Sequence, residues 1–164
     1  MVSLRDPIMN VQDAIRESYL AQGFTEEQLE QLYAIAEERS YVDGEPILRQ
    51  FDDSQDLLIL ASGRANILTV IGEPIGVVKP GMPLGEISFL DSKPRSVSVV
   101  SSGPSDAVVL PAGPLRKILQ ERPDIALRAL LNISRVLCAR LRAANNNIAA
   151  LMAIDESETS LSRG

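Results

Sequence analysis

An acid and an arginine stand close together in the middle of the chain, in the segment 84–99, LGEISFLDSKPRSVSV. Glu86 and Arg95 are separated by a short apolar run, and the whole segment is too apolar for a surface loop. A guanidinium is a planar fork that fits phosphate oxygens, and a carboxylate accepts a hydrogen bond from a hydroxyl. The pair therefore suits one ligand that carries a phosphate and a free hydroxyl, such as a ribose 2′-OH. The alternative is that Glu86 and Arg95 pair only with each other.

The residues beside this pair offer further contacts for an anion. Gly85 allows the backbone to approach a ligand closely, although a turn alone would also require it. Residues 86–90 can form one helical turn, and its free N–H groups, that of Ile87 among them, can bind an anion. Ser96 adds a hydroxyl and a backbone N–H, or it merely faces solvent on an alternating strand.

Several kinds of chemistry are excluded by what the sequence lacks. It has no histidine and a single cysteine, Cys138. The lack of histidine and of a second cysteine excludes Ser-His-Asp and Cys-His nucleophiles, and it excludes zinc sites built from His and Cys. The motifs G-x-G-x-x-G, G-x-x-x-x-G-K-[ST] and G-x-S-x-G do not occur. We therefore expect no enzyme activity, no metal and no cofactor.

Charge and hydropathy restrict the partners and the compartment. The net charge of −6 has the wrong sign for a nucleic-acid binder. No apolar run approaches the roughly 20 residues that span a bilayer. Arg5, Asp6 and Pro7 interrupt the N-terminal segment, which therefore lacks the apolar centre of a signal peptide. With one cysteine, these features predict a cytoplasmic protein that binds neither nucleic acid nor membrane.

The central part of the chain has the pattern of an all-β domain. From residue 40 onward, glycine and proline recur every few residues between short runs of Val, Ile and Leu. Many short strands without intervening helices indicate an antiparallel sandwich, jelly roll or barrel. The expected strands are 46–51, 56–61, 64–71, 74–79, 96–101 and 105–110.

Helical patterns lie on both sides of the predicted strands. Residues 1–39 are expected to be a helical segment, with Thr25 and Gln28 forming a capping box. After the β domain at 40–112, residues 113–154 are expected to form two helices, a short one and a long one that starts at Pro123. The polar tail 155–164 is expected to be disordered.

Apolar residues recur every seven positions along the long helix. This heptad pattern either packs on the protein's own sheet or pairs with a second copy. One row is Leu127, Ser134, Leu141 and Ile148, and the other is Leu130, Leu137, Ala144 and Leu151.

The segment GEISFLDSKPRSVSV resembles the phosphate-binding cassette of cyclic-nucleotide-binding domains. Those domains have Gly-Glu, a few apolar residues, a short loop, then Pro-Arg-Ser/Thr/Ala and an alternating strand. The likeness covers about residues 24–150, with Gly44 and Gly63 at the usual glycine turns. The matching cassette residues are Gly85, Glu86, Pro94, Arg95 and Ser96.

One departure follows Gln50, where Phe51 and Asp52 replace the family's usual Gly-Asp or Gly-Glu. This departure is expected to concern only a turn and to leave the phosphate site untouched. The transcription factors of the family continue into a helix-turn-helix domain, and its kinase subunits carry a second copy. Neither feature is found in this sequence, so a stand-alone domain is expected here.

The resemblance implies a fold, a ligand and a set of contacts. The fold is α+β, mainly β: an eight-stranded antiparallel jelly roll flanked by N-terminal helices and a long C-terminal helix. The ligand is cAMP or cGMP, between which the sequence does not choose, and its binding would reposition the long helix. The implied ligand contacts are Gly85, Glu86, Ile87, Arg95 and Ser96 of the cassette, Ile75 as an apolar wall and Asn145 towards the base.

The resemblance also implies a parallel homodimer along the long helix, from Leu127 to Leu151, and an effector protein of unknown identity. Two alternatives stay open. The domain is a structural dimerisation or interaction module with a silent nucleotide site, or it is the sensor half of a DNA-binding regulator. The negative charge counts against the second alternative.

Overall fold

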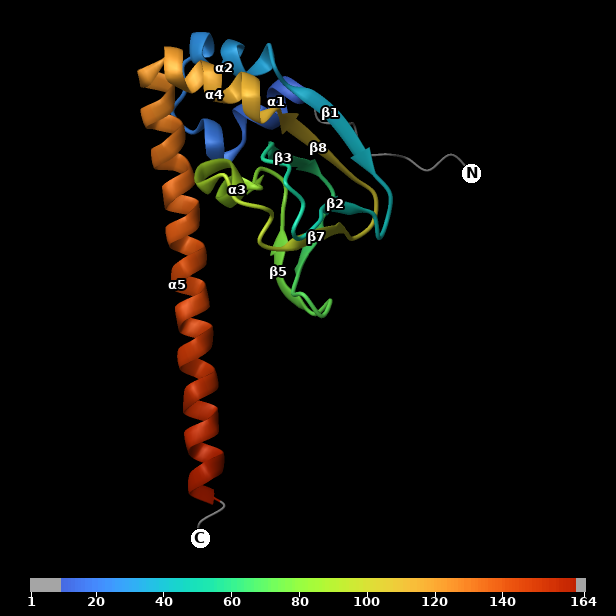
Figure 1. The fold of residues 1–164 in the computed structure, drawn as a ribbon, viewed down its shortest axis with the longest axis vertical. Helices are drawn as coiled ribbons and strands as arrows, with labels where there is room; N and C mark the ends of the chain where they lie inside the picture. Colours follow the sequence, from blue (N-terminus) through green and yellow to red (C-terminus); the bar gives the residue numbers. More distant parts are fainter. Residues whose placement is uncertain (1–9, 162–164) are drawn as a thin grey trace.

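Two four-stranded antiparallel sheets form the body of the protein, as the computed structural model shows for residues 10–161 (Figure 1). This confirms the expected fold class, a mainly β domain of eight antiparallel strands flanked by helices. The first sheet has the order β1 (Glu37–Tyr41), β8 (Ser105–Leu110), β3 (Leu57–Ser62), β6 (Pro83–Leu84). The second has the order β2 (Pro46–Leu48), β7 (Ser98–Ser101), β4 (Ala65–Leu68), β5 (Pro74–Val78).

Strand β3 lies in the interior and contributes to two hydrophobic cores. Its first five side chains are all buried, because one face of its sheet meets the second sheet and the other face meets the helices. Successive side chains of a strand point to opposite faces. Leu57 and Ile59 therefore pack with the helices, while Leu58 and Leu60 pack between the sheets.

The N-terminal helices close the outer face of the first sheet. They are α1 (Val11–Arg16), the 3-10 turn η1 (Tyr19–Ala21) and α2 (Glu26–Tyr33). At the start of α2, the Gln28 N–H donates to Thr25 Oγ1 at 3.3 Å and the Thr25 N–H donates to Gln28 Oε1 at 3.0 Å. The predicted capping box is thus confirmed.

Strand β1 occupies Glu37–Tyr41, where the sequence pattern predicted the end of a helical segment at residue 39. The first four side chains of β1 are exposed, because β1 pairs with β8 alone and lies at the edge of its sheet. Charged residues on an edge strand hide the alternation by which strands are recognised.

A short helix and a very long helix complete the chain. They are α4 (Ala112–Glu121) and α5 (Pro123–Leu161). The beginning of α5 packs on the body through Ile125 and Ile133. Asn132, also buried, donates through Nδ2 to the carbonyls of Leu20 at 2.8 Å and of Gln22 at 2.9 Å, and thereby fixes α5 to η1.

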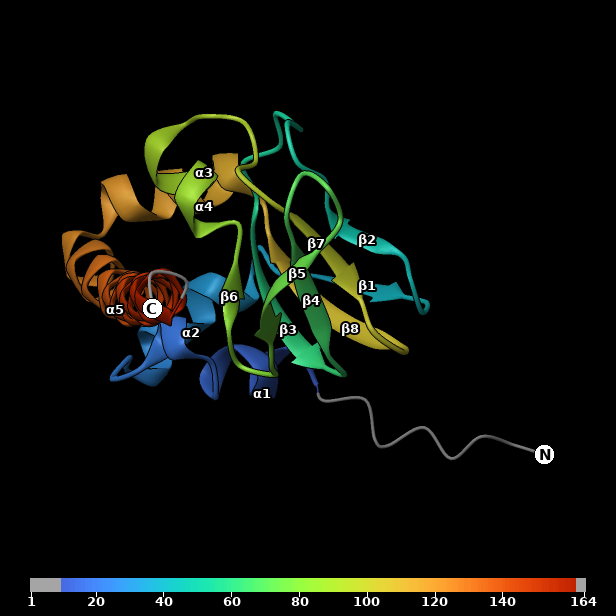
Figure 2. The same ribbon diagram turned by 90° about the horizontal axis from the view of Figure 1, so that it is seen from below.

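Past residue 140, α5 leaves the body and continues alone (Figure 1). Every side chain from 141 to 155 is exposed. Figure 2 looks along the axis of α5 and shows both sheets lying to one side of it. The helix continues to residue 161, so much of the tail that was expected to be disordered is helical here. No helix within residues 10–161 is long and apolar enough to cross a membrane.

Candidate ligand pocket

A pocket opens where the predicted cassette meets both sheets and α5. Its empty volume, open mouth included, is about 370 Å³. Five of the predicted contacts line it together, namely Gly85, Glu86, Ile87, Arg95 and Ser96. The remaining lining residues are Leu48, Ile67, Leu84, Ser88, Val97, Val99 and Arg140.

Gly85 turns the chain into helix α3 (Glu86–Asp91) at the edge of the pocket. Its φ of +76° lies in the left-handed region, which favours glycine. A Cβ at this position would lie 2.8 Å from the carbonyl oxygen of Asp56. Both the turn and the close packing therefore require glycine here.

Glu86 is almost completely buried at the start of α3, with an exposed fraction of 2%. Its Oε1 accepts a hydrogen bond from Nη1 of Arg140 on α5, and the two form an ion pair. Nη2 of Arg140 donates to the carbonyl of Pro83 at 3.0 Å. Burial raises the pKa of the Glu86 carboxyl above its ordinary value, and the charge of Arg140 opposes that rise.

Arg140 was not among the residues predicted from the sequence. The available signal was indirect: a carboxylate in an apolar segment needs a cation, and the following helix offers several arginines. The structure pairs Glu86 with Arg140, and the interpretation in which Glu86 and Arg95 pair with each other is corrected accordingly.

Arg95 is also buried, with an exposed fraction of 3%. Nη1 donates to the carbonyl of Gly85 at 3.0 Å, and Nη2 donates to the carbonyl of Asp56 at 2.7 Å and to Ser54 Oγ at 3.3 Å. Nε is buried and has no partner among the described residues. Burial lowers the pKa of Arg95, while the nearby charges of Asp56, Asp52 and Glu86 raise it.

Two predicted contacts do not reach the pocket of this single chain. Ile75, on edge strand β5, is 60% exposed, and Asn145 is exposed on the part of α5 that has left the body. Neither lines the pocket. Gly76 lies directly opposite Ile67 in the β4–β5 pair, so the apolar wall at this point comes from Ile67 instead of Ile75.

The pocket has hydrogen-bond donors at one side, a carboxylate beside them and an aliphatic lining elsewhere. The Arg95 guanidinium, whose Nε is unbonded within the described part of the chain, and the first backbone N–H groups of α3 provide donors at one side. A carboxylate already bonded to α5 lies close by, and aliphatic side chains cover the rest. Such a site suits a ligand with an anionic group, a hydroxyl and an apolar surface.

A sequence model described as "Cyclic nucleotide-binding domain" matches residues 38–122, about half of the chain. The chain belongs to the cyclic nucleotide-binding domain family. The match runs from the second residue of β1 to just past the end of α4, and it includes the whole cassette.

A solved structure and two curated proteins illustrate what this chain is similar to. A solved domain from Methylobacillus flagellatus superposes with a TM-score of 0.74 at 26% identity, over 84% of this chain and 80% of that one. A CRP-like cAMP-activated global transcriptional regulator of Mycobacterium tuberculosis is 37% identical over 93 residues, 57% of this chain and 37% of the regulator. Glutaminase 1 of Bradyrhizobium diazoefficiens is 27% identical over 82% of this chain and 22% of its own length. The chain thus spans well under half of these two curated relatives.

The family departure at Phe51 touches the site, contrary to the expectation that it concerned only a turn. Phe51 has a φ of +70° and is 72% exposed. Its N–H donates to the carbonyl of Arg95 at 2.9 Å, and the Arg95 N–H donates to the carbonyl of Asp52 at 2.8 Å. In this cyclic nucleotide-binding domain, the turn after β2 therefore holds the backbone of the pocket arginine directly.

Proposed function

We propose that this domain is a non-catalytic cyclic-nucleotide sensor of the cytoplasm that binds cAMP or cGMP. The observation that carries the proposal is the state of Arg95, a buried guanidinium in the pocket wall whose Nε has no partner among the residues that the structure describes. A buried N–H left unbonded costs about 1–3 kcal/mol. A phosphate that binds Nε and Nη2 side-on would remove that cost and use the planar fork of arginine.

The rest of the nucleotide has matching surfaces around Arg95. Ser96 and the first N–H groups of α3, including that of Ile87, complete the proposed phosphate contacts. Glu86 accepts the ribose hydroxyl, and Ile67 and Val99 cover apolar parts of the ligand. The cAMP-activated relative supports a cyclic nucleotide as the class of ligand.

Ligand binding would be communicated to α5 through Glu86. A ribose hydroxyl and Arg140 would compete for, or share, the same buried carboxylate. Any change in that ion pair alters the hold of the body on α5 at the point where the helix leaves it. Couplings of this kind are typically worth about 1–3 kcal/mol.

A parallel dimer along α5 fits this mechanism. The exposed part of α5 carries Leu141, Ile148 and Leu151, which are 62%, 56% and 67% exposed. With Leu141 and Ile148 at heptad position a, Arg140 falls at g and Asn145 at e, and these positions face each other across a parallel pair. The predicted role of Asn145 would thus be fulfilled across the dimer, from a second copy.

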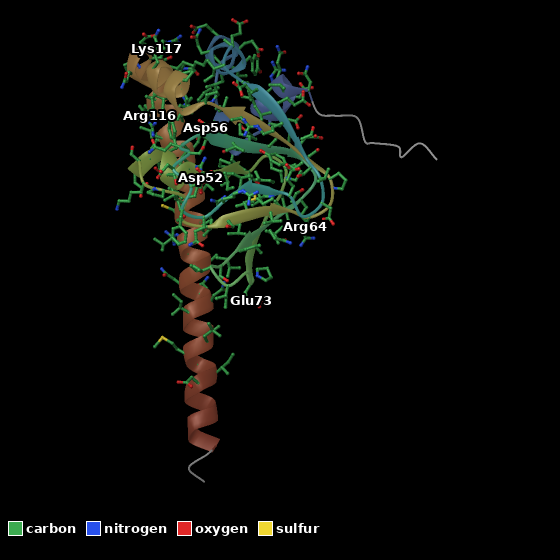
Figure 3. The ribbon with its side chains drawn as sticks, turned by 45° about the vertical axis from the view of Figure 1, so that its right-hand side comes forward. Asp52, Asp56, Arg64, Glu73, Arg116 and Lys117 are labelled. Carbon is green, nitrogen blue, oxygen red and sulfur yellow. The ribbon has the colours of Figure 1, made fainter. Side chains whose placement is uncertain are left out.

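Calorimetric titration with cAMP and with cGMP tests the proposal. The matched variants are Arg95→Lys, which keeps the charge and loses the fork, and Arg64→Lys, which changes an exposed arginine (Figure 3). We expect binding by the unmodified protein and by Arg64→Lys, and at least tenfold weaker binding by Arg95→Lys. The proposal fails if neither nucleotide binds at millimolar concentration or if Arg95→Lys binds as well as the unmodified protein.

The second candidate function is a structural interaction module with a silent site. The observation in its favour is that Arg140 already satisfies Glu86 without a ligand. Thermal unfolding separates the two functions. A true ligand at 100 times its dissociation constant stabilises the fold by about 2.7 kcal/mol, whereas a silent site gives no shift.

A further inference from the structure

The loop between β2 and β3 contacts both the side chain and the backbone of Arg95. Ser54 contributes its hydroxyl and Asp56 its backbone carbonyl as acceptors for Nη2. The backbone of Arg95 is bonded on both sides to Phe51 and Asp52 of the same loop. A movement of the Arg95 guanidinium would therefore displace this loop first.

The same loop also contacts the start of α4, through the side-chain carboxylate of Asp56. Oδ1 of Asp56 accepts a hydrogen bond from the N–H of Ala112 at 2.8 Å. The residue in the capping position of α4, Pro111, provides no side-chain cap of its own. The carboxylate of Asp56 thus takes the place of the missing cap, where a negative charge is favoured by the helix dipole.

Gln55 makes a second bridge between the cassette and α4. Its Nε2 donates to the carbonyl of Ser92 at 3.0 Å, and its Oε1 accepts from Nη2 of Arg116 at 2.8 Å. Arg116 also donates to the carbonyl of Phe89 at 2.9 Å, and its guanidinium lies 4.9 Å from the centre of that ring. Figure 3 shows Asp56 and Arg116 on the same side of the molecule, with Arg64 well away from both.

Helix α4 packs in turn on the anchored part of α5. Leu115 of α4 belongs to the same buried cluster as Ala129 and Ile133 of α5, and Leu137 packs against that cluster. The pocket therefore reaches α5 by two separate chains of contacts. One is the direct pair of Glu86 with Arg140, and the other leads through Asp56 and α4.

We propose that Asp56, supported by Gln55, is a positioning residue that transmits the state of Arg95 to the start of α4. The backbone carbonyl of Asp56 accepts a hydrogen bond from the pocket arginine. Its carboxylate accepts one from the first residue of α4, whose capping residue provides no side-chain cap. A ligand that engages Nη2 of Arg95 would compete with the Asp56 carbonyl, shift the loop and alter the cap of α4. The part of this inference that involves a ligand rests on the proposed function.

Hydrogen exchange of the Ala112 amide reports this contact directly, because the Asp56 carboxylate is the acceptor that the structure gives it. In Asp56→Ala we expect at least tenfold faster exchange at Ala112 and unchanged exchange at Val108 in β8. Asp56→Asn keeps an acceptor at the same place and should stay within threefold of the unmodified protein. If Asp56→Ala leaves the Ala112 rate unchanged, Asp56 does not hold the helix and the inference is wrong.

Transmission is tested first without any nucleotide. Arg95→Lys removes the hydrogen bond from Nη2 to the Asp56 carbonyl, and we expect at least fivefold faster exchange at Ala112. Arg64→Lys is the matched control and should change nothing. An Ala112 rate in Arg95→Lys equal to that of the control overturns the inference, whatever the ligand proves to be.

The second test adds saturating cAMP or cGMP, with binding verified by calorimetry. Ala112 exchange should change at least fivefold in the unmodified protein and stay constant in Asp56→Ala. Binding without any change at Ala112 contradicts transmission. If neither nucleotide binds, the proposed function is wrong. The inference is then tested only by the ligand-free comparison of Arg95→Lys with Arg64→Lys.

Discussion

Arg140 on α5 bonds the carboxylate of Glu86 on α3, although the two residues lie 54 positions apart in the chain. The carboxylate side of the pair is 2% exposed, and the arginine side is 29% exposed. Removing two charges from water is costly, so such a pair adds little net stability compared with apolar residues of similar size. In the proposed function, its role is to make the position of α5 depend on what else Glu86 binds.

Arg140→Ala should destabilise the fold by about 2 kcal/mol, because it leaves a buried carboxylate without its cation. Urea unfolding gives the free energy. Arg142→Ala, an exposed arginine two positions further along α5, is the matched control and should stay within about 0.5 kcal/mol of the unmodified protein. Equal losses in the two variants would contradict the role assigned to the pair. Adding Glu86→Gln to Arg140→Ala should recover part of the loss.

Glu86 should make the protein less stable as the pH rises. Burial raises the pKa of its carboxyl in the folded state above the ordinary value of 4.5, so the folded protein holds this proton more tightly than the unfolded chain. The resulting stabilisation is fully present below pH 4.5 and is lost as the pH rises through the folded pKa. The free energy of unfolding of the unmodified protein minus that of Glu86→Gln should therefore fall across this interval. Urea titrations at a series of pH values measure it, and a rising difference would mean that Arg140 outweighs burial.

Phe51→Asn should stabilise the domain by about 0.5–1 kcal/mol. A left-handed conformation costs an ordinary L-residue roughly 1–2 kcal/mol, and asparagine tolerates it better. Val70→Asn is the control, because Val70 is also 72% exposed and does not have a positive φ. Urea midpoints with unchanged slopes would give the values. No gain over the control would show that contacts of the Phe51 ring compensate for the backbone conformation.

Charges placed in the heptad seam of α5 should separate the proposed dimer. Leu141→Glu with Ile148→Glu puts two acids at successive a positions, whereas Asn146→Glu with Ala153→Glu puts the same charge on the outer face. Analytical ultracentrifugation should give the 17.8 kDa monomer for the first pair and twice that mass for the second and for the unmodified protein. A monomer in all three samples would exclude the dimer.

The strand pattern was predictable because local signals agreed with the fold. Glycine and proline marked the turns, and the apolar runs between them are the buried strands β3 and β8. Gly85 and Arg95 were recognisable from their residue types, since a left-handed turn and a phosphate fork each favour one kind of residue. Strand β1 was not recognisable, because its charged edge position removes the alternation.

Contacts between segments far apart in the chain could not be predicted from the sequence. Nothing local identifies Arg140 as the partner of Glu86 among the arginines of α5, because the choice depends on where the helix crosses the cassette. The choice of Ile67 over Ile75 depends on the register of β4 against β5. The double role of Asp56 depends on three segments meeting, none of which carries a signal for the others.

Asn132 gives α5 a pivot close to its start. From there to residue 161 the helix extends 29 residues, roughly 43 Å at a rise of 1.5 Å per residue. A tilt of about 10° at the pivot would sweep the far end through roughly 7 Å, given that length. The protruding helix thus has the geometry of a lever arm, in which a displacement beside the pocket would be magnified roughly threefold at its tip.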